Sequence, residues 1–331
     1  MRIAAVQLDA RVADIETNLE ACERLADRAG ADGAEAVVLP EFFTTGVGFV
    51  EELADAALAP DGAATDLLRS LARRHGALVG GSFLCRDEDG EVRNAFLLAD
   101  REGEIAGRHD KDLPTMWENA LYVGGHDDGV IEIPQNGLLS GSASEHPRVT
   151  IGAAVCWELM RTQTVRRLRG RVDLALTGSG WWSFSDNWPP QAVWRRRERA
   201  NHALAIRAAE QFATFIGAPV AHAAHCGELR CPMPWSPMPY SGRFEGGARI
   251  VAADGRVLAA RDRGDGEGVA IADVEPTRRP PLREPPDRFW LHRRGAAAAF
   301  AWNYQRLHGR RWYRDHVAGR PAREVRSGVP A

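Results

Sequence analysis

Short apolar runs alternate with amphipathic helical patterns in the first and third quarters of this chain, and that order limits the folds open to it. Apolar runs of strand length occur at 2–8, 35–40, 148–156 and 172–178, and patterns with helical spacing occur at 14–29, 65–76, 161–170 and 191–212. Further strand-like runs lie at 77–84, 92–100, 214–223, 246–261 and 268–274. This alternation predicts an α/β protein with mixed sheets inside and helices outside.

Local signals place several element boundaries. Asp14 or Thr17 can cap the first helix, and Gly76 directly follows the second one. Pro40 stops the strand at 35–40, and the Asp-Gly pair at 254–255 is typical of a hairpin turn.

The composition changes near the end of the chain. The stretch EPTRRPPLREPP at 275–286 holds five prolines in twelve residues, which favours an extended path over the surface. We therefore expect one domain over 1–274 and a Pro-rich arm over 275–331, with an aromatic helix near 300–313. Such an arm must pack on something, and a partner subunit is favoured over its own domain.

The charge balance narrows the range of partners. The chain has 42 Lys and Arg against 45 Asp and Glu, so its formal net charge is −3. This gives no reason to expect nucleic acid or a membrane as a partner. No signal peptide is expected, and no run approaches the roughly 18 apolar residues of a membrane helix. Five scattered cysteines fit a reducing compartment, so a cytoplasmic protein is predicted.

Reactive side chains stand where predicted strands end. Glu41 follows the strand at 35–40, and Cys156 closes the run GAAVC. Lys111 and Glu118 flank a Pro-Thr pair in HDKDLPTMWENALYVGG. Taken singly, these residues read as a solvated glutamate, a loop lysine and a small buried cysteine. At the edge of an α/β sheet, however, such side chains can converge on one cleft.

The three stretches together resemble the carbon–nitrogen hydrolase family, the nitrilase superfamily. LPEFFTTG resembles its glutamate motif, HDKDLPTMWE its lysine motif and GAAVCWE its cysteine motif, in that chain order over about residues 2–274. The resemblance implies that Glu41 is the general base, Lys111 the catalytic lysine and Cys156 the nucleophile. It also implies a four-layer αββα sandwich, with two mixed sheets inside and helices outside, and at least a homodimer.

A further family glutamate follows the lysine in the pattern E-x-x-x-[aromatic]-x-x-G. Glu118, Tyr122 and Gly125 match it. The resemblance therefore assigns Glu118 an auxiliary role, positioning either Lys111 or the substrate.

The chemistry of these residue types agrees with that assignment. A thiol has a pKa near 8.5, so it needs a group to take its proton and a charge that favours the thiolate. Glu41 can do the first and Lys111 the second. Attack by Cys156 creates an anion, for which the Lys111 ammonium and the backbone N–H of Trp157 are candidate donors. The set needs no histidine, cofactor or metal, and none is predicted.

The bond that is cleaved stays open between two branches. CWE at 156–158 and the pattern K-x-x-P-T-x-x-E from Lys111 to Glu118 resemble nitrilases. LPEFFTTG resembles amidases more closely, and amide cleavage is the commoner activity of the superfamily. We favour a small-molecule amide, with a nitrile as the alternative. Transfer of the acyl group to an amine is a further alternative.

The segment GSGWWSFSDNWPPQAVW at 178–194 offers candidates for a substrate pocket. Trp181 and Trp182 follow the strand after Cys156, and Trp117 lies in the lysine motif. These rings are predicted to line the pocket, with core or subunit packing as the alternative. Ser179 and Asn187 are weaker candidates for contacts to polar substrate groups.

A competing site of another class lies in HAAHCGELRC. His222, His225, Cys226 and Cys231 fall within ten residues and are of the types that bind zinc. Their spacing matches no strong motif, so a non-enzymatic zinc or ligand-binding module at 222–231 is retained only as an alternative to a substrate-facing or plain loop.

Overall fold

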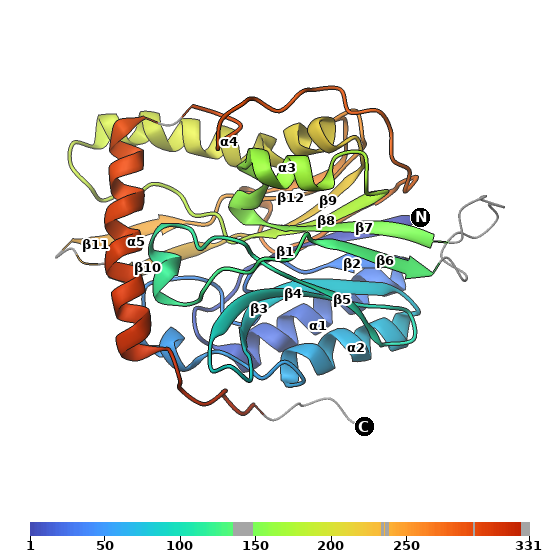
Figure 1. Cartoon of the computed structure of the whole chain (residues 1–331), viewed down its shortest axis with the longest axis horizontal. Coiled ribbons are helices and arrows are strands. Elements are labelled where there is room, and N and C mark those ends of the chain that lie inside the picture. Colours follow the sequence, from blue (N-terminus) through green and yellow to red (C-terminus); the bar gives the residue numbers. More distant parts are fainter. Residues whose placement is uncertain (135–147, 233–234, 236–237, 294, 326–331) are drawn as a thin grey trace.

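The computed structural model describes residues 1–134, 148–232, 235, 238–293 and 295–325 (Figure 1). The strands are β1 (Arg2–Leu8), β2 (Ala36–Val38), β3 (Leu78–Arg86), β4 (Val92–Ala99), β5 (Ile105–Asp110), β6 (Val130–Pro134), β7 (Arg148–Val155), β8 (Leu174–Ser179), β9 (Val220–His225), β10 (Glu228–Pro232), β11 (Pro239–Arg243), β12 (Gly246–Val251), β13 (Val257–Asp262) and β14 (Gly268–Asp273). The helices are α1 (Ile15–Ala31), α2 (Ala63–His75), α3 (Thr162–Leu168), α4 (Gln191–Ile216) and α5 (Ala296–His316), with short 3-10 turns that include η2 (Met116–Ala120) and η3 (Cys156–Met160).

The strands run in the order β5-β4-β3-β2-β1-β9-β8-β7-β6, with β14 paired to β1, β12 paired to β9 and β13 paired to β12. From β3 to β7 through β2, β1, β9 and β8, each neighbouring pair is parallel. Two antiparallel steps through β4 give β5 the same direction as β3. The carboxyl ends of β2, β5, β7 and β8 therefore point the same way, where α/β folds build their sites.

Helices cover the strands from two sides. In Figure 1, α1 and α2 lie below the strands, and α3 and α4 lie above them. The predicted α/β class is confirmed. The four-layer αββα order stays a prediction in its detail, because the short pairing of Gln7 and Leu8 with Ala224 and His225 joins the two expected sheets into one hydrogen-bonded network.

Local sequence signals account for several boundaries. Asp14 caps α1 by accepting a hydrogen bond from the backbone N–H of Thr17 at 3.2 Å, and Gly76 ends α2 with a left-handed φ of 57°. The strand expected at 214–223 is wrong in its first half. Helix α4 continues to Ile216, and Gly217, at φ 75°, ends it before β9 begins.

The chain after residue 274 packs against its own domain. Helix α5 lies along η2, where Gly309 approaches Asn119 so closely that an added Cβ would sit 2.9 Å from it. Near the end of α5, the Tyr313 hydroxyl donates to Glu91 at 2.5 Å and accepts from the N–H of Val92 at 2.8 Å. The expected contact between this arm and a partner subunit stays a prediction, as does the boundary at 274. Within the described ranges, a helix of sufficient length and apolarity to cross a bilayer is not found.

Candidate active site

The sheet topology brings the sequence-predicted side chains to one edge. Glu41 comes three residues after β2, Lys111 directly follows β5, and Cys156 directly follows β7. Gly180 follows β8, the strand that pairs with β7. The motifs converge because their strands share a direction, although the side chains lie far apart in sequence.

Glu41 is fully buried and both of its carboxylate oxygens are held. Oε1 accepts hydrogen bonds from Lys111 Nζ at 2.8 Å and from Asn94 Nδ2 at 2.9 Å. Oε2 accepts from the backbone N–H of Gly180 at 2.8 Å. These donors fix the direction of the carboxylate, and the charge of Lys111 offsets the cost of burying it.

Lys111 lies between two carboxylates. Its Nζ donates to Glu118 Oε2 at 2.7 Å in addition to Glu41. Burial alone would lower the pKa of Lys111, but the negative charges of Glu118 and Glu41 outweigh it, so that its pKa is raised well above the usual value. Lys111 is therefore an ammonium ion in the neutral pH range.

One carboxylate oxygen of Glu118, Oε2, accepts three hydrogen bonds. Oε2 also accepts from the Tyr122 hydroxyl at 2.5 Å and from the N–H of Thr115 at 2.9 Å. Burial raises the pKa of Glu118, and the charge of Lys111 opposes that rise. Of the two auxiliary roles predicted for Glu118, positioning Lys111 agrees with its hydrogen bond to the lysine.

Gly125 completes the pattern that begins at Glu118. Its N–H donates to the carbonyl of Lys111 at 3.0 Å, and an added Cβ would stand 2.3 Å from Cβ of Asp110. Only glycine fits so close to the segment that carries the lysine.

Cys156 is the first residue of η3 and occupies a strained turn directly after β7. Its φ of 54° is left-handed, which is uncommon for a residue with a side chain and recurs at functional turns. Phe42 next to Glu41 and Met116 in the lysine motif share this conformation, with φ of 53° and 51°. Each of the three motifs thus contains one non-glycine residue in a left-handed turn.

The thiol of Cys156 is only 1% exposed and faces charged neighbours. Burial raises its pKa well above the usual value, and the carboxylate of Glu41 adds to that rise. Lys111 lowers the pKa, as expected from the sequence, but does not outweigh the other two effects. The resting group is a neutral thiol that needs a base, and Glu41 interacts with it directly.

A second buried cluster supports the turn, and sequence reasoning did not find it. Glu158 accepts from the N–H of Val155 at 2.7 Å and from the N–H of Asp112 at 3.1 Å, so it ties the cysteine turn to the lysine motif. His109 donates to Glu158 at 2.8 Å and contacts Asp127 at 2.5 Å. The glutamate of CWE is thus a structural anchor.

Comparison with known proteins identifies the family. A family model described as carbon-nitrogen hydrolase matches residues 2–283. The chain belongs to the carbon–nitrogen hydrolase family.

Relatives of this hydrolase include both predicted branches. An aliphatic nitrilase from Rhodococcus rhodochrous is 24% identical over 301 residues, covering 83% of this chain and 75% of the nitrilase. A 2-oxoglutaramate amidase from Bacillus subtilis (strain 168) is 31% identical over 137 residues, covering 40% of this chain and 51% of the amidase.

A solved structure agrees in fold. An amidase from Nesterenkonia sp. AN1 in complex with butyramide matches with a TM-score of 0.60 and 22% identity, covering 83% of this chain and 91% of that chain. At this identity the likeness establishes the nitrilase-superfamily fold.

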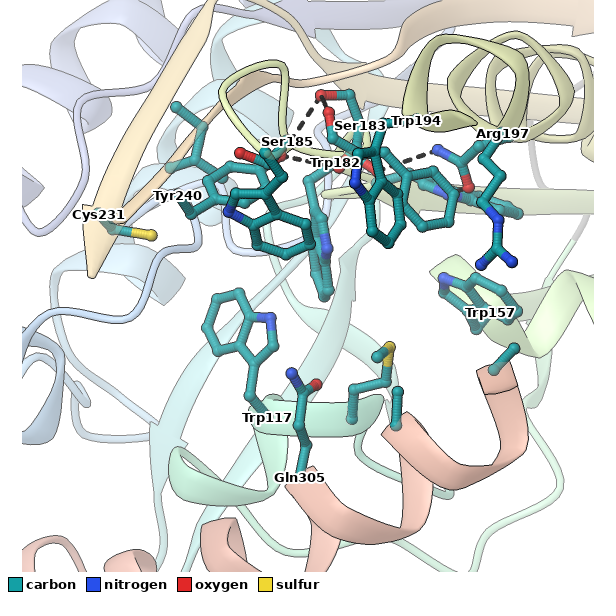
Figure 2. A pocket seen from close by; sticks show the side chains of 18 residues that line it. Trp117, Trp157, Trp182, Ser183, Ser185, Trp194, Arg197, Cys231, Tyr240 and Gln305 are labelled. Carbon is teal, nitrogen blue, oxygen red and sulfur yellow. Dashed lines mark hydrogen bonds between the residues drawn. The ribbon is translucent and has the colours of Figure 1, made fainter. Parts of the chain in front are cut away.

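Beside the buried charges, the hydrolase has a cavity of about 290 Å³ (Figure 2). The predicted pocket residues Trp117, Trp181 and Trp182 all lie on its wall, together with Trp157. The rings of Trp117 and Trp182 are 4.9 Å apart, and those of Trp157 and Trp181 are 4.7 Å apart. Cys156 is not itself a lining residue, but its chain neighbour Trp157 is, and Trp117 and Trp181 are in the same way the chain neighbours of Glu118 and Gly180.

Ser179 and Asn187, the further candidates for contacts to polar substrate groups, are not among the lining residues of this cavity. Ser179 Oγ bonds His222 Nε2 at 3.1 Å, and Asn187 Nδ2 donates to the carbonyl of Pro239 at 3.4 Å. Their polar atoms bond protein groups in this structure, and contacts of these two residues to a substrate stay predictions.

The structure does not assemble the alternative zinc site. His222 is held by Thr177 and Ser179, while His225 Nε2 bonds the carbonyl of Glu41 at 2.5 Å. Across the described ranges, no three His, Cys, Asp or Glu side chains are grouped to hold a metal ion. Cys231 instead lines the cavity, as a substrate-facing loop would.

Proposed function

We propose that this hydrolase cleaves the carbon–nitrogen bond of a small-molecule amide through a thioester on Cys156. The observation that carries the proposal is the buried Glu41 carboxylate, which is bonded to the Lys111 ammonium at 2.8 Å and interacts with the Cys156 thiol. A base, a cation and a thiol in one water-poor site are what acyl transfer requires.

In the first half of the reaction, Glu41 removes the proton of Cys156 as the sulfur attacks the amide carbon. The C=O bond becomes a C–O⁻ single bond, and the Lys111 ammonium and the N–H of Trp157 donate to that oxygen. Protonated Glu41 then gives its proton to the amide nitrogen. The C–N bond breaks, ammonia or an amine leaves, and a thioester remains on the sulfur.

In the second half, Glu41 removes a proton from water while the water oxygen attacks the thioester carbon. The tetrahedral anion meets the same two donors. The C–S bond then breaks, the acid leaves and the proton on Glu41 returns to sulfur. Glu118 does not exchange protons in this scheme, because its bond to Lys111 serves to direct the ammonium.

A nitrile is the second candidate substrate. The observation that favours it is the aliphatic nitrilase relative, which matches 83% of this chain, whereas the 2-oxoglutaramate amidase matches 40%. A nitrile would add to the same sulfur to give a thioimidate, and water would then release ammonia from it.

The test is ammonia release from matched amides and nitriles with the same carbon chain. We expect release from the amide by the wild-type protein and a loss of about 10²–10⁴-fold for Glu41→Gln, the usual contribution of a general base. Cys156→Ser should lose more, because a serine hydroxyl is a far weaker acid than a thiol. Wild-type rates in both variants would refute the proposal, and release from the nitrile alone would replace the amide with the nitrile.

The third candidate, transfer of the acyl group to an amine, is tested on the same samples. Added hydroxylamine or a primary amine would be acylated faster than water if an acceptor site exists. A homo-oligomer and a cytoplasmic location stay predictions, to be tested by light scattering and by cell fractionation.

A further inference from the structure

The cavity that Trp157, the chain neighbour of Cys156, helps to line is large enough for an aromatic ring and is lined by rings. Its volume is about 290 Å³, whereas an apolar cavity of about 150 Å³ is enough to take up benzene in another protein. Trp117, Trp182, Trp157 and Trp181 form two of its ring pairs, and Tyr240 adds a further ring. Flat apolar walls of this kind favour a flat apolar ligand.

Several polar groups of this wall are already bonded to protein. Trp181 Nε1 donates to Asn201 Oδ1 at 3.2 Å, and Asn201 Nδ2 donates to Glu245 Oε1 at 2.6 Å. The Tyr240 hydroxyl donates to the carbonyl of Ser183 at 2.8 Å. These groups shape the cavity and are not available as strong ligand contacts.

Gln305 is different. It lines the cavity from α5, its side chain is only 4% exposed, and Oε1 has no hydrogen-bond partner in the part of the chain that the structure describes. Figure 2 shows its carboxamide reaching from α5 into the cavity beside Trp117. A buried amide oxygen without a partner costs about 1–3 kcal/mol, so a ligand gains affinity when the carboxamide turns toward the cavity and this oxygen accepts a hydrogen bond from it.

The helix that carries Gln305 lies outside the part of the chain that the family model matches. That match ends at residue 283, and α5 begins at Ala296. Ala298 and Ala301 line the cavity from the same helix, at a spacing that places them on one face with Gln305. These two small residues leave room in front of Gln305, so α5 forms an apolar part of the cavity wall in which Gln305 is the polar residue.

We infer that the acyl part of the substrate is an aromatic ring bearing a hydroxyl group, and that Gln305 is the residue that selects it. This inference rests on the proposed amide hydrolysis and names its substrate class. A phenolic hydroxyl can donate to the amide oxygen and accept from the amide nitrogen, so it fits either orientation of the carboxamide. The ring stacks between the tryptophans, and the amide end is directed toward Cys156.

A carboxylate-bearing aliphatic amide fits this cavity less well. Arg197 is the basic residue among the lining side chains, and it is exposed and stacked on Trp194 with 5.4 Å between its guanidinium carbon and the ring centroid. An exposed arginine pairs weakly with an anion. The apolar walls would also have to accept a charged group without a buried partner.

The experiment compares amides that differ only in the ring hydroxyl. Release of ammonia from 2-(4-hydroxyphenyl)acetamide, 2-(3-hydroxyphenyl)acetamide, 2-phenylacetamide and succinamate gives kcat/KM for each. We expect at least one hydroxylated amide to exceed the unsubstituted one by about tenfold, the effect of one hydrogen bond to a buried group. Succinamate should be the poorest substrate.

Two variants on α5 test whether Gln305 causes the preference for the hydroxylated ring. Gln305→Leu keeps the size of the side chain and should remove the preference, so that the hydroxylated and unsubstituted ring amides have kcat/KM values within about twofold of one another in the variant. Asn303→Leu makes the same kind of change at an exposed position of α5 and should keep it. A preference that survives Gln305→Leu, equal rates for all ring amides, or succinamate as the best substrate would overturn the inference.

Binding to the Cys156→Ala variant separates this inference from the proposed reaction. Calorimetry with the same amides reports recognition without turnover. If the wild type cleaves none of them while Cys156→Ala still binds the hydroxylated ring more tightly through Gln305, the reaction is wrong and the pocket assignment holds. If the amides are cleaved but neither binding nor kcat/KM depends on the hydroxyl, the pocket assignment is wrong and the reaction holds.

Discussion

Replacing His109 with glutamine should cost stability in a way that depends on pH. The imidazole is fully buried between Glu158 and Asp127. Burial alone would lower its pKa, but the two carboxylates raise it from 6.5 to about 9. Because the folded-state pKa lies above the unfolded one, the stabilisation is complete below about pH 6.5 and is lost as the pH rises through about 9.

The size of the effect follows from that pKa difference. At about 1.4 kcal/mol per pH unit, a rise from 6.5 to about 9 corresponds to roughly 3 kcal/mol of folding free energy. In the variant, Glu158 keeps the N–H donors of Val155 and Asp112 and has Arg167 at 3.5 Å, so we expect it to stay ionised. The variant should therefore lose the part of the pH dependence of unfolding free energy that comes from His109 and keep the rest.

Urea unfolding followed by tryptophan fluorescence at about pH 6 and about pH 10 measures the difference. Between these values the wild type should lose roughly 3 kcal/mol more unfolding free energy than His109→Gln, while titrations elsewhere cancel between the two proteins. Equal losses in both proteins would refute the reasoning, because they would mean that His109 carries no charge in the folded state.

Two further substitutions test the environment of Lys111. Tyr122→Phe removes the hydroxyl that donates to Glu118 at 2.5 Å. The unfolding free energy, measured by urea unfolding, should fall by about 1.5–3 kcal/mol, and the rate of ammonia release should fall with it. Unchanged stability would mean that this hydrogen bond is not formed. Gly125→Ala places a methyl group 2.3 Å from Cβ of Asp110, so the segment that carries Lys111 must move. In steady-state assays kcat should drop at least about tenfold. A wild-type kcat would contradict the close approach of Gly125 to Asp110.

The features that the sequence predicted correctly depend on residues that are close together in the chain. The cap at Asp14 and the helix end at Gly76 depend on residues within one turn, and the strand-end positions of Glu41 and Cys156 follow from apolar runs that stop there. The first half of the strand predicted at 214–223 is helical because its apolar pattern suits a buried helix equally well, and Gly217 marks the change before β9.

What the sequence did not reveal depends on contacts between distant segments. His109 and Glu158 are 49 residues apart, and nothing near either one indicates the pairing. Asn94 offered a weak signal, since it is a polar residue within the apolar strand VRNAFLLA, and it proved to hold Glu41. Gln305 had no local signal, because its position on the cavity wall follows from the packing of α5 against η2.

The most direct test of the account is mass spectrometry of the peptide that contains Cys156 after brief reaction with substrate and an acid quench. For an amide we predict an adduct on Cys156 equal to the substrate less one ammonia, which is the thioester, and the adduct should be absent in Cys156→Ala. For a nitrile the first adduct would equal the whole substrate. Turnover with no adduct on Cys156, or an adduct only on Cys22, Cys85, Cys226 or Cys231, would contradict the assignment of the nucleophile.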